Sequence, residues 1–306
     1  MHIPDGFLSL PVAGVSWAVS AVGIGYSVRK TRFELKEKTI PLMGIMAAFV
    51  FAAQMLNFPV GAGTSGHLLG GVLTAAFLGP YAGALVLTCV LIVQAVVFKD
   101  GGLLTLGANI LNMAILGTMF GYIIYRGIFR LTRRIGLSVG IAGWLSVVLG
   151  ASLCAAELAA SKTAPARFVF PAMAGVHALI GIGEGVITTF VVGFVLKIRP
   201  DLIYTAGSPA WSVRERKKAF AIAGAAVFVL ALCAPFASRF PDGLEKVADA
   251  LGFLNREMMS RTAPLADYGW PGIGNEKTAA ILAALTGTVL VAGTALLVAR
   301  ITRKNG

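Results

Sequence analysis

Apolar residues recur along this chain in long runs, and clusters of Gly, Pro and charged residues separate one run from the next. A run of about 20 apolar residues is long enough to cross a hydrocarbon core of roughly 30 Å as a helix. The pattern predicts an all-α polytopic membrane protein, in which the short, Gly-rich third segment is of half length or partly re-entrant. The nine predicted spans cover residues 8–28, 40–57, 67–79, 81–98, 103–125, 138–160, 170–196, 218–236 and 278–299.

Composition supports the same class of protein. Apolar residues make up 57% of the 306 residues, charged residues 13%, and the mean hydropathy is +0.82. A soluble globular chain is nearer half apolar and a quarter charged. A water-soluble enzyme, a disordered chain and a secreted disulfide scaffold are therefore excluded, and Cys89, Cys154 and Cys233 all lie inside apolar runs as small buried residues.

The net charge of +12 does not indicate a nucleic-acid partner, because the basic residues lie in short segments between spans, where Lys and Arg set membrane orientation. Of the 26 Lys and Arg residues, 18 fall in alternate segments of the chain. Residues 1–7 contain no basic residue, so no cleaved leader is expected and Met1 is predicted to be the first residue of the mature protein. The N-terminus is predicted to lie outside and the C-terminus in the cytoplasm of a multi-pass cell-membrane protein. The basic segments are 29–38, 126–134, 197–218 and 300–304.

The spacing of the spans predicts two units. Residues 1–200 form a seven-span membrane domain with short loops, and residues 201–217 form a polar cytoplasmic linker. Residues 218–306 form a two-span hairpin, whose loop at 237–277 is long, rich in Pro, Gly and charge, and extracytoplasmic on the predicted topology.

The histidines are the main candidates for chemistry. His2 is the second residue, His67 ends the Gly-rich loop 60–71, and His177 lies in a span. On the predicted topology both His2 and the loop that carries His67 face outside, so they can meet. The alternatives are that His2 is an incidental terminal residue, that His67 is an interfacial polar side chain, and that His177 serves helix packing.

An N-terminal His2 offers a particular mode of metal binding. The Met1 amine, the His2 backbone nitrogen and the His2 imidazole Nδ1 can chelate one ion in fused small rings, and His67 can complete a square-planar set of four nitrogens. That geometry favours Ni(II) or Cu(II) over Zn(II), which prefers a tetrahedron. Binding would release protons, so affinity is expected to fall as the imidazoles protonate below a pH of roughly 6.5.

Two acids inside spans, Glu157 and Glu184, are costly to bury and by default indicate function. Glu184 is two helical turns from His177, so the two share a helix face, as a buried polar pair, a proton relay, a second metal site or a structural lock. An alternative function follows from these acids: a proton-coupled secondary carrier of metal cations that uses Glu157 and Glu184.

Three motifs in the N-terminal two thirds resemble one known family. MHIPDGF (1–7), GTSGHLLGG (63–71) and HALIGIGEGVIT (177–188) together resemble the CbiM/NikM substrate-binding (S) components of energy-coupling factor transporters for cobalt and nickel. PDGLE (241–245) and YGWPGIGNE (268–276) look like the small NikN/CbiN-type companion, fused here to the first unit.

The resemblance implies a metal site and partners. Its metal ligands map onto Met1, His2 and His67, with Asp5, Ser65, His177 and Glu184 as possible supporting polar residues. It implies a transported Ni2+ or Co2+ ion, no cofactor, a transmembrane transducing (T) subunit and cytoplasmic ATPases. Pro4-Asp5 departs from the Met-Glu expected in many relatives, which leaves the role of Asp5 open.

The sequence indicates that this chain does not hydrolyse ATP by itself. It contains no Walker A pattern, no HExxH and no GxSxG, so it is predicted not to be an enzyme, and the energy must come from partner subunits. Gly44, Ala48 and Ala52 form a small-xxx-small run on which a partner helix can dock closely. Ordinary packing inside the chain is the alternative.

Overall fold

Long apolar helices dominate the computed structural model, which describes residues 1–34, 39–61, 63–204, 213–258 and 263–303. Within those residues, six helices have the length and hydropathy of a membrane crossing, and two shorter apolar helices, Thr39–Gln54 and Ala221–Leu232, accompany them. All nine predicted segments are helical, and the third is short, as expected. The protein is a multi-pass membrane protein. The six long helices are Leu10–Phe33, Pro80–Phe98, Leu106–Thr132, Ile135–Ala160, Ala166–Ile198 and Glu276–Thr302.

The elements follow one another with short connections, apart from the loop before the last helix. Two of the long helices contain π-helical stretches, Gln94–Phe98 after α4 and Ile110–Phe120 after α5, in which the backbone is wound more widely than in an α-helix. In chain order the elements are α1 (Leu10–Glu34), α2 (Thr39–Gln54), β1 (Phe58–Gly61), β2 (Thr64–Gly66), α3 (Gly71–Leu78), α4 (Pro80–Val93), α5 (Leu106–Asn109), α6 (Gly121–Thr132), α7 (Ile135–Ala160), α8 (Ala166–Ile198), α9 (Val213–Leu232), α10 (Gly243–Ala250) and α11 (Glu276–Thr302).

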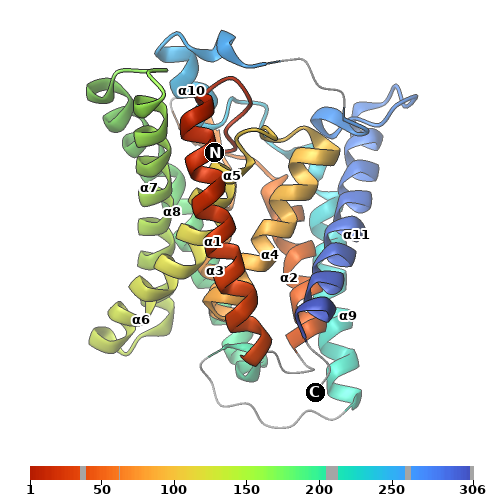
Figure 1. The fold of residues 1–306 in the computed structure, drawn as a ribbon. Coiled ribbons are helices and arrows are strands. Elements are labelled where there is room, and N and C mark those ends of the chain that lie inside the picture. The colour runs from red at the N-terminus through yellow and green to blue at the C-terminus, as the bar shows by residue number, and fades with distance from the viewer. Residues whose placement is uncertain (35–38, 62, 205–212, 259–262, 304–306) are drawn as a thin grey trace.

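The helices form a bundle with the first four near its middle (Figure 1). Helices α6, α7 and α8 lie on one side, and α9 and α11 pack against α2 on the other side. The chain between α9 and α11 crosses one end of the bundle, where α10 packs on α8 and β2. The C-terminal unit therefore contacts the N-terminal unit both along the helices and across that end.

A short antiparallel hairpin, β1–β2, departs from the predicted all-α fold. Phe58 pairs with Gly66 and Pro59 with Ser65. At the turn, Gly61 and Gly63 have φ angles of +113° and +69°, in the left-handed region that glycine adopts readily. The glycines of this loop thus allow a tight reversal that delivers His67 back toward the bundle.

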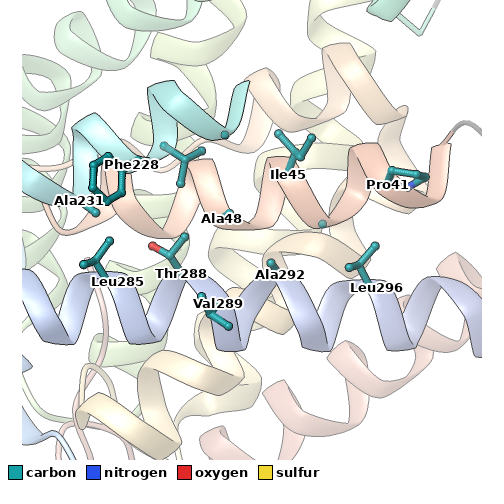
Figure 2. A pocket seen from close by; sticks show the side chains of 13 residues that line it. Pro41, Ile45, Ala48, Phe228, Ala231, Leu285, Thr288, Val289, Ala292 and Leu296 are labelled. Atoms are coloured by element: carbon teal, nitrogen blue, oxygen red, sulfur yellow. The ribbon is translucent and has the colours of Figure 1, made fainter. Parts of the chain in front are cut away.

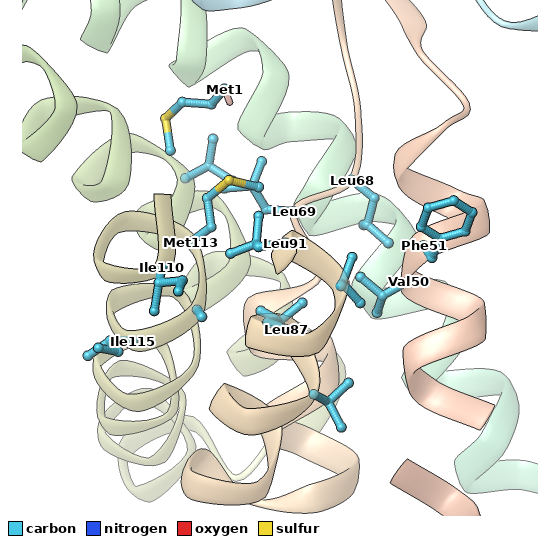
Figure 3. Close-up of a cluster of buried hydrophobic side chains, with 14 of the residues drawn as sticks. Met1, Val50, Phe51, Leu68, Leu69, Leu87, Leu91, Ile110, Met113 and Ile115 are labelled. Carbon is cyan, nitrogen blue, oxygen red and sulfur yellow. The ribbon is translucent and has the colours of Figure 1, made fainter. Parts of the chain in front are cut away.

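The interior contains a continuous cluster of apolar side chains from α2, α3, α4 and the π-helical stretch after α5. Met1 belongs to this cluster and is 2% exposed, and its side chain points toward Met113 and Leu69 (Figure 3). Its terminal methyl group packs close to Gly150 of α7. The first residue of the chain is therefore part of the core, and its amine is held where the side chain fixes it.

The small-residue face of α2 is covered by the chain itself. A Cβ added at Gly44 would lie 2.8 Å from Leu296 of α11, and Ala48 and Ala52 pack with Val227 of α9. The three helices enclose an apolar groove of about 470 Å³ (Figure 2). The small residues thus admit the protein's own helices in this conformation, and docking of a transducing subunit on Gly44, Ala48 and Ala52 stays a prediction.

Candidate metal centre

The first nine residues are not helical, and they enter the bundle beside the loop that precedes α5. The backbone of Ile3 is held on both sides: its N–H donates to Asn109 Oδ1 at 2.8 Å, and its carbonyl accepts from Thr105 Oγ1 at 2.6 Å and from Gly102 N at 2.9 Å. Ile3 and Phe7 are 0% and 1% exposed. These contacts fix the position of the two residues ahead of Ile3.

Asp5 anchors this segment and does not point at the histidines. Its carboxylate accepts hydrogen bonds from the backbone N–H groups of Leu103, Leu104 and Thr105 at 2.9–3.2 Å. A Cβ at Gly102 would collide with the same carboxylate, which explains the glycine at that position. The role that the sequence left open for Asp5 is thus support of the N-terminal segment.

His67 follows strand β2, and Glu184 of α8 fixes the turn beyond it. The Glu184 carboxylate accepts from the backbone N–H groups of Leu69 at 2.6 Å and Gly70 at 3.0 Å, and its side chain is fully buried. His67 Nδ1 lies 3.0 Å from the carbonyl oxygen of the next residue, Leu68. With a proton on Nδ1, the Nε2 lone pair of His67 faces away from its own loop and is available as a ligand.

The structure brings Met1, His2 and His67 together. The Met1 amine nitrogen lies 3.0 Å from His67 Nε2 and 2.9 Å from Asp242 Oδ2. The rings of His2 and His67 are stacked, with centroids 5.2 Å apart and planes inclined by 23°. Two imidazoles, an amine and the backbone nitrogen of His2 therefore occupy one small volume.

A chain of buried amides connects His2 to the His67 loop. His2 Nε2 lies 3.2 Å from Gln94 Oε1, Gln94 donates to Gln54 at 2.8 Å, and Gln54 donates to the Leu69 carbonyl at 3.0 Å. His2 Nδ1 lies 3.1 Å from Asp100 Oδ1. To chelate through Nδ1, the His2 imidazole must turn away from Asp100 toward the amine.

The surroundings lower the pKa of both imidazoles. Burial lowers the pKa of the His2 imidazole below its usual range, although the Asp100 carboxylate opposes part of the shift. Burial and then the Met1 ammonium lower the pKa of His67 well below its usual range. Burial alone would raise the pKa of the Asp242 carboxyl, but the adjacent ammonium and the hydrogen bonds to the carboxylate together outweigh it and hold that pKa far below its usual range. The site thus combines nitrogen donors whose protonated forms are disfavoured by burial with an ionised carboxylate.

A cavity of about 320 Å³ opens beside these groups, and its lining is mostly polar. Acidic side chains around it give a local negative potential that attracts cations. In the described parts of the chain, no cluster of three or more His, Cys, Asp and Glu side chains is arranged to hold a metal ion. The acids that line the cavity are Asp100, Asp242, Glu245, Glu257 and Asp267.

The other predicted residues make their hydrogen bonds to groups other than the amine. Ser65 contacts the C-terminal loop, because its hydroxyl donates to the Phe240 carbonyl at 2.7 Å. His177 and Glu184 share the buried face of α8 as predicted, but His177 Nδ1 contacts the Met173 carbonyl at 2.9 Å and Glu184 turns to the loop after His67. Glu157 accepts from Ser16 and Asn112, in a separate polar cluster.

The sequence did not single out Gln54, Gln94, Asp100 or Asn109. Gln54 and Gln94 had a signal that was available, since an amide inside an apolar run needs a buried partner. Asp242 lies in the long loop at 237–277, and nothing in its surroundings in the sequence indicates contact with Met1.

Replacement of Glu184 by glutamine is expected to weaken Ni2+ binding about 10- to 100-fold, the range typical of residues that orient metal ligands. Glutamine keeps one acceptor oxygen but turns an NH2 group toward a backbone N–H, so the loop that carries His67 shifts. Glu157→Gln makes the same chemical change in another span and is the control, with a change within about threefold because the site is separate. Equal losses in both variants, measured by calorimetry, would contradict this role for Glu184.

Comparison with known proteins matches each of the two parts of the chain to a family model. Residues 2–202 match the CbiM model, described as the cobalt uptake substrate-specific transmembrane region, and residues 216–304 match the PDGLE domain. A protein of Archaeoglobus fulgidus named as a fused nickel transport protein NikMN is 39% identical over 295 residues, which are 95% of each chain. The fused nickel transport protein NikMN of Rhodobacter capsulatus is 32% identical over 228 residues, 69% of this chain and 66% of that one.

A solved structure of a transporter is also similar to this chain. The crystal structure of a truncated transition metal transporter superposes with a TM-score of 0.60 at 35% identity, covering 65% of this chain and 99% of that one. The apolar helices and these relatives define a multi-pass membrane protein that transports a transition-metal ion. The chain belongs to the CbiM family of cobalt and nickel transport proteins, and its C-terminal part belongs to the PDGLE domain family. The resemblance seen in the sequence motifs is thereby confirmed.

Proposed function

We propose that this chain is the substrate-binding component of an ATP-driven importer of Ni2+ or Co2+. The ion is bound by the Met1 amine, the backbone nitrogen and imidazole of His2, and the imidazole of His67. The observation that carries the proposal is the buried Met1 nitrogen, 3.0 Å from His67 Nε2 with the His2 ring stacked on His67. Among the described residues, no hydrogen-bond partner of the His2 backbone nitrogen is present, so that nitrogen is free to bind the ion.

Four nitrogen donors in one plane suit Ni(II) better than they suit cations that prefer oxygen ligands. Co(II) shares the preference for imidazole-type ligands. The ion is cargo and leaves again, so the protein needs a site that can be dismantled. A terminal segment of nine residues held by hydrogen bonds is easier to displace than ligands fixed on two long helices, because local opening costs less where few elements must move.

The orientation of the chain follows from its charges. The ends of α1, α6, α8 and α11 that adjoin the Lys- and Arg-rich segments lie at the end of the bundle where the C-terminus lies (Figure 1). We assign that end to the cytoplasm and the metal centre to the outer side. Residues 1–200 then form the metal-binding domain, 201–217 a cytoplasmic linker of which 205–212 lie outside the described residues, and 218–306 the PDGLE domain.

Energy comes from partners, since the chain has no Walker A pattern. A transmembrane transducing subunit and cytoplasmic ATPases would form the importer with it. In proteoliposomes, Ni2+ uptake is expected only when the chain is reconstituted with those subunits and ATP. Uptake by the chain alone, indifferent to ATP and abolished by Glu157→Gln and Glu184→Gln, would instead support the proton-coupled carrier.

Metal binding is expected to release about two protons near neutral pH, one from the Met1 ammonium and one from the His2 amide. Because the pKa values of both imidazoles lie below their usual range, these rings add fewer protons to that number than free imidazoles would. Their protonation weakens binding only as the pH falls through their lowered pKa values. Calorimetry in buffers of different ionisation enthalpy counts the protons, and a count near zero at pH 7 would contradict the chelate.

A further inference from the structure

The segment Pro241–Glu245, here called the PDGLE turn, sits directly over the candidate metal centre although it belongs to the C-terminal domain. Ser65 of β2 binds the start of the turn, because its N–H donates to the Pro241 carbonyl at 2.9 Å and its hydroxyl donates to the carbonyl of the preceding residue, Phe240, at 2.7 Å. Gly243 lies so close to His177 that an added Cβ would be 2.8 Å from the ring. The turn is therefore docked on two elements of the N-terminal domain.

The carboxylate of Asp242 is held in a fixed orientation by the helix that it begins. Asp242 Oδ1 accepts from the Glu245 N–H at 2.8 Å, and Glu245 returns a hydrogen bond from its carboxylate to the Asp242 N–H at 2.9 Å, which is a capping box. The second oxygen, Oδ2, accepts from the Met1 amine at 2.9 Å. One oxygen thus caps α10 and the other reaches the proposed metal ligand.

A second contact from the same domain reaches the other end of the proposed chelate. Tyr268, in the loop before α11, donates its hydroxyl to Asp100 Oδ2. The other oxygen of Asp100, Oδ1, lies 3.1 Å from His2 Nδ1. The C-terminal domain therefore contacts Met1 directly, through Asp242, and His2 indirectly, through Asp100.

We propose that the PDGLE turn is a lid on the metal centre, in which Asp242 is a positioning residue that holds the Met1 amine opposite His67 and balances the charge of the bound ion. The inference rests on the proposed function of the site. An amine that gives its lone pair to a metal keeps two N–H groups, and one of them can still donate to Asp242. A divalent ion on an amine, a deprotonated amide and two imidazoles keeps a charge of +1, which one carboxylate neutralises.

The lid couples the two domains. If Asp242 strengthens metal binding by a given factor, then bound metal strengthens docking of the PDGLE turn by the same factor, because the coupling free energy is reciprocal. The C-terminal domain would therefore be held closed on a loaded site and would open more readily on an empty one.

The test compares Asp242→Asn with Asp249→Asn in the full chain with its native N-terminus. Asparagine caps a helix about as well as aspartate, so the first variant removes the charge and leaves α10 capped. Asp249 is exposed on the same helix, which makes its variant a matched control. Asp242→Asn is expected to lower Ni2+ affinity about 10- to 100-fold by calorimetry, and Asp249→Asn to leave it nearly unchanged.

Hydrogen exchange of the α10 amides gives a second measurement. Ni2+ is expected to slow exchange of residues 243–250 in the wild-type chain and in Asp249→Asn, and to have little effect in Asp242→Asn. If the wild type binds Ni2+ and both variants bind as it does, with equal slowing of exchange, the lid is overturned while the proposed function stands. If the wild-type chain binds no Ni2+ at all, the proposed function fails and the lid with it.

Discussion

A chain that carries one extra residue ahead of Met1 is expected to lose Ni2+ affinity on the order of 10³-fold or more, since it loses a donor that the fold holds in place. The Met1 side chain is fully buried, and its nitrogen lies between His67 and Asp242. An added residue converts the amine to an amide and removes the ammonium that pairs with Asp242. The added residue must also find room beside the buried Met1 nitrogen. Calorimetry on the purified protein measures the loss.

A cleavable leader provides the control for this experiment. A leader whose protease leaves Met1 as the new first residue should block binding before cleavage and restore it afterwards in the same preparation. Restoration separates loss of the ligand from loss of the fold. Binding that is equal before and after cleavage would show that the amine is not a ligand, and would indicate His177 and Glu184 as ligands instead.

Replacement of His67 by alanine is expected to reduce Ni2+ affinity about 100-fold or more, since it deletes one of four nitrogen donors and leaves one position of the square-planar site without a protein ligand. His67 is 5% exposed and faces the amine, and Glu184 holds the loop that carries it, so no other imidazole is placed to substitute for it. The absorption of the bound ion should change together with the affinity, because water would enter the fourth position.

His177→Ala is the matched control, because it removes another buried histidine from the same protein. His177 Nε2 has no hydrogen-bond partner among the described residues, yet its ring lies against Gly243 and not beside His67. Its loss is expected to cost less affinity than the loss of His67, because His177 contacts the PDGLE turn and supplies no ligand. The opposite ranking, with His177→Ala far weaker than His67→Ala, would place the ion on α8.

Much of the fold follows from local pattern. Each of the nine apolar runs falls on a helical part of the structure, because each helix must bury or expose a continuous apolar surface on its own. The hairpin at 58–66 was not predicted, since its strands are short and its glycines are compatible with any loop. The π-helical stretch at Gln94–Phe98 also escaped prediction, because its periodicity is set by the neighbouring loop and not by the apolar pattern.

Some residues of the candidate site could likewise be predicted from the sequence, and others could not. Met1, His2 and His67 were predicted because their chemistry is unusual at those positions and because motifs carry them. Asp242 was not predicted to contact Met1, although its contact with the amine is as short as that of His67, because 241 residues separate the two and no periodicity reports such a contact. The packing of α9 and α11 on the small residues of α2 was not predicted for a related reason, since small residues indicate that a helix approaches but not which helix.

The central claim is that four nitrogens, three of them from the first two residues, bind the transported ion. The most direct test is the absorption and magnetism of the native full-length chain loaded with one equivalent of Ni2+ near neutral pH. A yellow, diamagnetic, square-planar ion is the result expected for the amine, the amide and two imidazoles. A green, paramagnetic, six-coordinate ion with water or carboxylate ligands would contradict the account.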